Sequence, residues 1–142
     1  MENGERNEVL LDFGSLWLRN DSVLQVQINP GVQVRYHEAR KLMETIRDLS
    51  RFTRRPVLLD LRGIKDMDTA ARFYFLGERA AAFKKSMALI VSSPTTKWLA
   101  NLSLFFSHPA CPTRVFMTEE AALHWSMQYL PSVKHTVHSV AA

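Results

Sequence analysis

The stretch Val57–Ala71, VLLDLRGIKDMDTAA, decides the fold. It opens with the apolar run Val57–Leu61, which contains a single carboxylate, Asp60. A run that is apolar on both faces predicts a strand in the middle of a sheet with helices on each side. Gly63 interrupts the strand, and Asp68-Thr69 opens a helical pattern. The sequence therefore predicts a buried strand that leads through a short polar loop to the start of a helix.

The segments on either side of this strand predict a single α/β domain. Apolar residues at 24, 26 and 28 alternate with glutamines, which indicates a strand with one exposed face. Strands separated by single helices require right-handed crossovers and a mostly parallel central sheet flanked by helices. The predicted order is β-β-α-β-α-β-α-β-α, with strands at 8–18, 24–28, 57–61, 87–91 and 113–117 and helices at 36–50, 68–84, 94–107 and 118–130.

The helix predicted at 68–84 would pack on the sheet through one apolar stripe, with Arg72 facing outward. Gly77 is interpreted as a position of close helix–sheet packing rather than as a break. The residues assigned to the stripe are Phe73, Leu76, Ala80 and Phe83.

Length and composition set the broad class. The chain has 142 residues, of which 46% are hydrophobic and 23% charged, as expected for one globular domain. We assign the domain to residues 8–130, with a disordered lead at 1–7 and a loose tail at 131–142. No apolar run approaches the roughly 20 residues that span a bilayer, and no signal peptide is visible. The single cysteine, Cys111, excludes an internal disulfide and favours a cytoplasmic location.

Charge and motifs exclude several function classes. The net charge is +4, but the basic residues are dispersed, and the densest group, Arg51–Arg55, falls where a helix should end. The pattern therefore argues against nucleic-acid binding. The five histidines show no metal-ligand spacing, and no Gly-rich phosphate loop, nucleophile elbow or cofactor motif is present. We expect no catalytic activity, no metal and no cofactor.

The element order over residues 8–130 resembles the STAS domain, the fold of bacterial anti-sigma-factor antagonists. The sharpest likeness is Asp60–Thr69, DLRGIKDMDT. In that family a strand ending Asp-Leu-x-Gly leads to Asp-Ser, and the serine is phosphorylated; Thr69 occupies the acceptor's place. The chain departs from the pattern at Ala70-Ala71, where the family has Ser or Ala and then Gly. It most resembles small stand-alone bacterial STAS/SEC14-like proteins without an assigned function.

The resemblance implies a non-enzymatic interaction module in which Thr69, with Asp68 and Asp60, forms a phospho-regulated switch. A phosphate at a helix N-terminus would be stabilised by free backbone N–H groups and by the helix dipole. The structural alternative is that Asp68 or Thr69 caps the helix and that Asp60 accepts backbone N–H bonds in the following loop.

The helix predicted at 94–107 is apolar over a broader surface than one contact with a sheet requires. Exposed apolar surface marks a partner surface or a ligand cavity. We expect homodimerisation through this surface, and the alternative function is binding of a small ligand or lipid. The residues assigned to it are Trp98, Leu99, Leu102, Phe105 and Phe106.

Overall fold

The strand predicted at the centre of the fold is β5, Arg55–Asp60. It pairs in parallel with β3, Leu24–Ile28, on one side and with β7, Lys84–Ile90, on the other. Leu58 and Leu59 are fully buried and point to opposite faces of the sheet, so both faces are covered, as the apolar run predicted. These assignments come from a computed structural model that describes residues 8–92 and 110–130.

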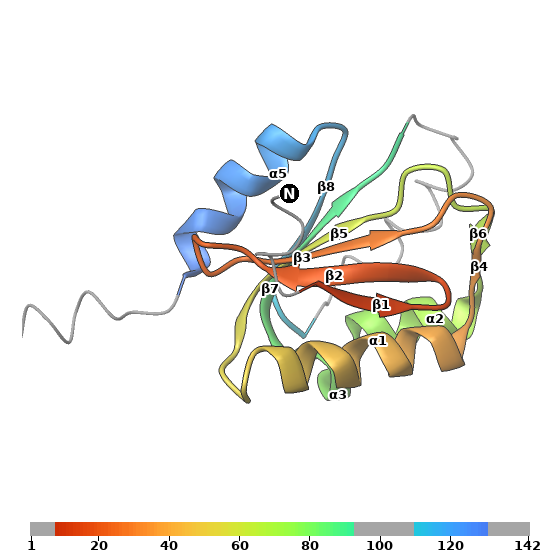
Figure 1. Cartoon of the computed structure of the whole chain (residues 1–142), viewed down its shortest axis with the longest axis horizontal. Helices are drawn as coiled ribbons and strands as arrows, with labels where there is room; N and C mark the ends of the chain where they lie inside the picture. Colours follow the sequence, from red (N-terminus) through yellow and green to blue (C-terminus); the bar gives the residue numbers. More distant parts are fainter. Residues whose placement is uncertain (1–7, 93–109, 131–142) are drawn as a thin grey trace, which may run out of the picture.

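Within residues 8–92 and 110–130, the main sheet has six strands in the order β1-β2-β3-β5-β7-β8 (Figure 1). The β3, β5, β7 and β8 strands run parallel, and β1 and β2 extend the sheet in antiparallel pairing. The predicted α/β fold with a mostly parallel central sheet is confirmed. The remaining strands are β1 (Val9–Leu11), β2 (Gly14–Leu18), β8 (Thr113–Phe116) and the separate parallel pair β4 (Gln33–Val34) and β6 (Asp66–Met67).

The single strand predicted at 8–18 is a tight hairpin of β1 and β2. The chain reverses at Asp12-Phe13, and Gly14 then lies opposite Ile28 of β3. A Cβ atom at Gly14 would stand 2.3 Å from the carbonyl oxygen of Gln27. Glycine is therefore required at position 14 by the close approach of the β3 backbone.

Three helices cover one face of the sheet (Figure 1). The α1 helix, Tyr36–Leu49, matches the helix predicted at 36–50 and buries one apolar stripe, Ala39, Leu42, Met43 and Ile46. The helix predicted at 68–84 is divided into α2, Thr69–Leu76, and α3, Glu78–Ala81.

Gly77 ends α2, and our interpretation of it as a packing position was wrong. Its backbone is extended, with φ −89° and ψ 177°, so the helix cannot continue through it. The predicted inner stripe was also partly wrong, because Phe73 is 59% exposed while Phe75 is buried. The helix begins at Thr69, and from that start Ala71 and Phe75 face the sheet.

The α5 helix, Glu119–Ser126, covers the opposite face and continues into the 3₁₀ turn η2, Met127–Tyr129 (Figure 1). Thr118 is its N-cap and accepts a hydrogen bond from Ala121 N–H at 3.2 Å. The predicted helix at 94–107 and the segments 1–7 and 131–142 lie outside the described residues.

Candidate functional site

Thr69 is the first residue of α2, and it is exposed. Asp68 precedes it as the N-cap, and its Oδ1 accepts a hydrogen bond from the backbone N–H of Ala71 at 2.8 Å. A carboxylate in this position satisfies a free N–H group at the helix start and interacts favourably with the helix dipole. The capping interpretation is therefore confirmed for Asp68, and the Thr69 hydroxyl has a different partner.

That partner is Arg72, whose guanidinium turns back toward the start of the helix. Its Nη2 donates a hydrogen bond to Thr69 Oγ1 at 3.2 Å, and its Nη1 donates to the backbone carbonyl of Met67. The spacing of three residues brings the Arg72 and Thr69 side chains together on one helix face. Because guanidinium is a planar donor suited to carboxylate and phosphate, a negative group on Thr69 would meet a cation already beside it.

The β4 and β6 strands hold this helix start in position. Val34 pairs with Met67, and the backbone N–H of Asp68 donates to the carbonyl of Val34 at 3.0 Å. Just before these strands, Gly31 N–H donates to the carbonyl of Gly63 at 2.8 Å. Both glycines have positive φ, 80° and 86°, a conformation that other residues adopt only with strain. Backbone hydrogen bonds thus fix the loop that leads from β5 to Thr69.

Exposed aromatic side chains lie on α2 and at the start of the neighbouring α1. Phe73, four residues further along α2, is 59% exposed. On the neighbouring α1, Tyr36 is 39% exposed and contacts Tyr74 edge-on, with ring centroids 5.4 Å apart. Aromatic and arginine side chains are enriched in protein interfaces. We refer to Tyr36, Thr69, Arg72 and Phe73 as the α2 surface.

Asp60 lies on the other face of the sheet and is not part of the α2 surface. It is buried, and its Oδ1 accepts hydrogen bonds from the backbone N–H and the Nε of Arg62 at 3.1 and 2.9 Å. Its Oδ2 accepts from Arg62 Nη2 at 2.7 Å. The side-chain hydrogen bond with Asp60 raises the pKa of Arg62. The expected structural role of Asp60 is confirmed, since the carboxylate accepts a backbone N–H in the following loop.

The buried Asp60 carboxylate belongs to a series of charged side chains that reaches α5. Arg62 Nη2 lies 3.8 Å from Glu119 Oε1, and Glu119 Oε2 lies 3.9 Å from Arg19 Nη1. Arg19 also bonds Asp21. Opposite charges alternate along this series, so it holds the loops on the α5 side together without leaving an uncompensated carboxylate.

Lys84 is a buried charged residue that the sequence analysis missed. It is 1% exposed, and its Nζ donates a hydrogen bond to the carbonyl of Phe75 at 2.8 Å, in the last turn of α2. Burial lowers the pKa of Lys84, and its interaction with the Cys111 thiol partly opposes that shift. Cys111 itself is a free, buried cysteine. The amine satisfies a carbonyl at the negative end of the helix and thereby ties α2 to β7.

The second surface predicted from the sequence, on the helix at 94–107, lies outside the described residues. Between α2 and β7, Met67, Phe75 and Met87 help to line a cavity of about 10 Å³, which has room for about one water molecule rather than a lipid. Within 8–92 and 110–130, no three His, Cys, Asp or Glu side chains come together as metal ligands. Among those same residues, no helix is long and apolar enough to span a membrane.

A family model matches residues 16–130 of the chain. The chain belongs to this family, DUF7793. Its description is "domain of unknown function". No curated protein matches the DUF7793 chain.

Two solved structures show which fold the DUF7793 domain has. A SpoIIAA-like protein of the DUF3478 family from Shewanella loihica PV-4, described as uncharacterized, is 14% identical over 83% of this chain and 97% of its own, with a TM-score of 0.57. The anti-sigma factor antagonist SpoIIAA in its unphosphorylated form is 16% identical over 79% of this chain and 96% of its own, with a TM-score of 0.53. The domain therefore has the SpoIIAA-like, or STAS, fold that the sequence predicted.

Proposed function

We propose that this chain is a non-enzymatic regulatory module that binds a partner protein through the α2 surface, and that phosphorylation of Thr69 controls this binding. The observation that carries the proposal is the contact between Arg72 Nη2 and Thr69 Oγ1. It places an exposed hydroxyl, a guanidinium and a helix N-terminus at one point of the surface. The fold supports the proposal, since an anti-sigma factor antagonist described by its unphosphorylated form shares it.

A phosphate on Thr69 would change the charge of the α2 surface. It adds about −1.5 to −2 charges at neutral pH, together with acceptor oxygens for Arg72 and for the free N–H groups at the start of α2. Asp66 and Asp68 lie within three residues of it in the chain, so the edge would become strongly negative. A partner that docks on Phe73 and on an unmodified Thr69 would then meet repulsion and a rearranged arginine. Phosphorylation is therefore expected to release the partner.

Mass spectrometry of protein purified from its own host tests the modification directly. Trypsin cleaves after Lys65 and Arg72, and the peptide between them, DMDTAAR, contains Thr69 as its only hydroxyl residue. A phosphate on this peptide therefore identifies Thr69 without fragmentation. We expect a phosphorylated fraction that phosphatase removes. A peptide that is unmodified under every growth condition would contradict the switch.

Partner binding is tested separately by affinity purification from the host with quantitative mass spectrometry. We expect a partner that wild-type protein and Thr69→Ala recover and that Thr69→Glu loses. Thr53→Glu is the matched control, because it adds the same charge at an exposed threonine at the other end of β5. Equal recovery with Thr69→Glu and Thr53→Glu would refute the α2 surface as the docking site.

We also propose that the protein forms a homodimer and that it is located in the cytoplasm. Sedimentation velocity over a range of protein concentrations measures the first, and a strictly monomeric species at all concentrations would exclude it. Fractionation of host cells measures the second, and recovery of the protein in a membrane or extracellular fraction would exclude it.

A further inference from the structure

A basic surface lies at the amino-terminal end of β5, opposite the end that leads to Thr69. The α1–β5 loop and the β2–β3 turn meet there, beside the first residue of β5, Arg55. β5 spans six residues, so the two ends of the strand are separated by roughly 20 Å. The α1–β5 loop at the lower left of Figure 1 marks this end, and β4 and β6 mark the other.

A hollow of about 550 Å³ opens between these two loops. Ligand sites in proteins commonly have volumes of about 300–1,000 Å³. Its polar walls are formed by Arg19 from the β2–β3 turn, Arg51 from the α1–β5 loop and Arg55, with Asn20 and Asp48 beside them. Three arginines from three separate segments thus border this hollow, and the Arg19 guanidinium is turned toward Gln25 and Glu119.

Two of these three guanidinium groups have no partner within the part of the chain that the structure describes. Arg19 is occupied by Asp21 and by Gln25, the latter at 2.6 Å. Arg51 and Arg55 form no side-chain hydrogen bond or ion pair there, and the Nε of Arg55 is buried without an acceptor. A buried donor without an acceptor carries a desolvation cost, which a bound anion would relieve.

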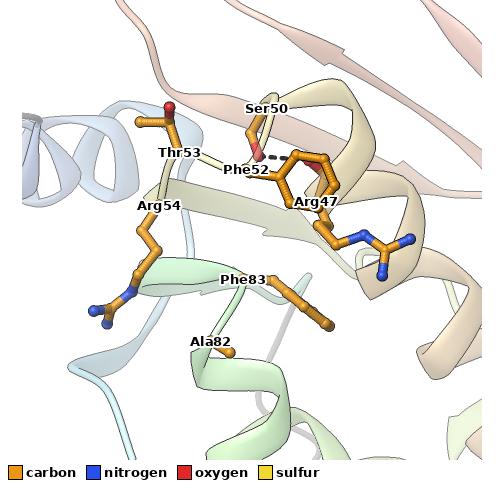
Figure 2. A pocket seen from close by; sticks show the side chains of 7 residues that line it. All are labelled: Arg47, Ser50, Phe52, Thr53, Arg54, Ala82 and Phe83. Carbon is orange, nitrogen blue, oxygen red and sulfur yellow. Dashed lines mark hydrogen bonds between the residues drawn. The ribbon is translucent and has the colours of Figure 1, made fainter.

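Arg47 and Arg54 are close to Arg51 and Arg55 in the sequence, but their guanidinium groups have partners. They line a smaller pocket on the other side of the same loop, where Arg47 and Arg54 stand at opposite edges (Figure 2). The Arg47 guanidinium lies 5.5 Å from the ring centroid of Phe52 and 5.7 Å from that of Phe83, and its Nε contacts Asp48 at 3.1 Å. Arg54 donates to a backbone carbonyl. Arg47 and Arg54 therefore have partners, and Arg51 and Arg55 are the cations left for a ligand.

The loop backbone is built to hold Arg51 in place. Arg51 and Phe52 have φ of 56° and 63°, and two successive non-glycine residues in the left-handed region are strained. Backbone hydrogen bonds keep them there: Arg51 N–H donates to the carbonyl of Asp48 at 3.2 Å, and Phe52 N–H donates to the carbonyl of Arg47 at 3.1 Å. These two bonds form the Schellman motif that ends α1, and they fix the backbone of Arg51 beside the hollow.

We propose that this hollow binds a phosphate group, carried by a soluble molecule or by a lipid headgroup. Arginine forks match phosphate oxygens in pairs, and Arg51 and Arg55 supply two forks that form no ion pair within the described residues. The Asp48 carboxylate that shares the wall is paired with Arg47. The site is separate from the α2 surface and does not depend on the proposed phosphorylation of Thr69.

NMR titration of the wild-type chain with inorganic phosphate, at constant ionic strength, locates the site. We expect saturable shifts at the amides of residues 18–20 and 48–55. Arg51→Gln and Arg55→Gln should each weaken the affinity about 10-fold, the loss expected for one charge-assisted contact. Arg40→Gln is the control: it removes one charge from an exposed α1 position where Arg40 pairs with Glu44, and should leave the affinity unchanged.

Vesicle sedimentation separates the two sources of phosphate. Binding to vesicles of phosphatidylcholine with phosphatidic acid, but not to phosphatidylcholine alone, identifies a lipid headgroup, and Phe52→Ser should then weaken vesicle binding only, because this ring is 77% exposed. Phosphate-induced shifts without vesicle binding identify a soluble ligand. The absence of both signals in the wild-type chain, or equal losses for Arg51→Gln and Arg40→Gln, overturns the site. Circular dichroism of each variant confirms that the fold is retained.

Discussion

Arg72 Nη2 lies 3.2 Å from Thr69 Oγ1 and donates a hydrogen bond to it within the first turn of α2. The same guanidinium also reaches the carbonyl of Met67, so its position does not depend on the threonine alone. The hydroxyl that we propose as the phosphorylation site therefore lies beside a cation that a second hydrogen bond holds in place. Two consequences of this pair are measurable in the free chain.

The first concerns negative charge at Thr69. We expect Thr69→Glu to raise the free energy of unfolding by about 0.5 kcal/mol, because the carboxylate lies at the helix N-terminus and near Arg72. Urea denaturation of Thr69→Glu, Arg72→Ala and the double variant gives the coupling between the two positions. A coupling energy of zero would show that Arg72 does not sense the charge at Thr69.

The second concerns the cap. Asp68→Ala removes the acceptor of the Ala71 N–H and should lower the free energy of unfolding by about 1 kcal/mol. Asp68→Asn keeps a capping oxygen and should recover most of this stability. Chemical denaturation at neutral pH measures both variants. Equal losses for the two would assign the effect to the charge of Asp68 instead of to its hydrogen bond.

Lys84 predicts a specific pH dependence. Burial lowers its pKa in the folded protein below the ordinary value of 10.5, so between the lowered value and 10.5 the unfolded chain binds more protons. In this window the free energy of unfolding rises with pH. The stability of the wild type relative to Lys84→Met should therefore increase as the pH is raised toward 10.5. Lys85→Met, at the exposed neighbouring position, is the control, and a pH-independent difference between wild type and Lys84→Met would contradict the shift.

Gly14 and Gly31 predict two different costs for the same substitution. Gly14→Ala places a Cβ 2.3 Å from the Gln27 carbonyl oxygen, and because that atom is strand backbone we expect a loss of about 2–3 kcal/mol. Gly31→Ala meets no atom within 4 Å but keeps φ at 80°, so we expect about 1–2 kcal/mol. Thermal unfolding ranks the two variants. A larger loss at Gly31 would mean that the β2–β3 pair yields more easily than its register suggests.

Hydrophobic pattern was sufficient to predict the sheet interior. The apolar run of β5 is a direct consequence of burial on both faces, so its position followed from the sequence. The alternation in β3 also located a strand, but the predicted exposed face was only partly right, because Gln27 is exposed and Gln25 is buried. We predicted that the β7 strand begins at Met87, because a lysine is not expected inside a sheet. The strand begins at Lys84. The burial of Lys84 depends on its hydrogen bond to the carbonyl of Phe75, which lies in α2 and not in β7.

The helix start was predictable, but its contacts were not. Asp68 or Thr69 was expected as a cap because residue type and position are local features, and the structure assigns the cap to Asp68. The contact between Arg72 and Thr69 depends on which residue begins α2, and the predicted helix, continuous to 84, gave the wrong phase for Phe73. Gly77 permits both a helix and a break, and tertiary packing decided between them.

The hollow at the start of β5 was also not visible in the sequence. Arg51–Arg55 were recognised as a basic group at a helix end, and that explanation was local. It did not include Arg19, which comes from a turn more than 30 residues earlier. The left-handed backbone at Arg51 and Phe52 is equally invisible in a sequence, because neither residue type favours it.

The pairing of Val34 with Met67 also has an electrostatic consequence. β4 leads directly into α1, and β6 leads directly into α2, so the two helices begin side by side at one edge of the molecule. Each helix start carries about half a positive charge. The carboxylates of Glu38 and Asp68 each accept a backbone N–H at these starts, so the positive end of each helix is offset by a side chain of its own first turn or cap.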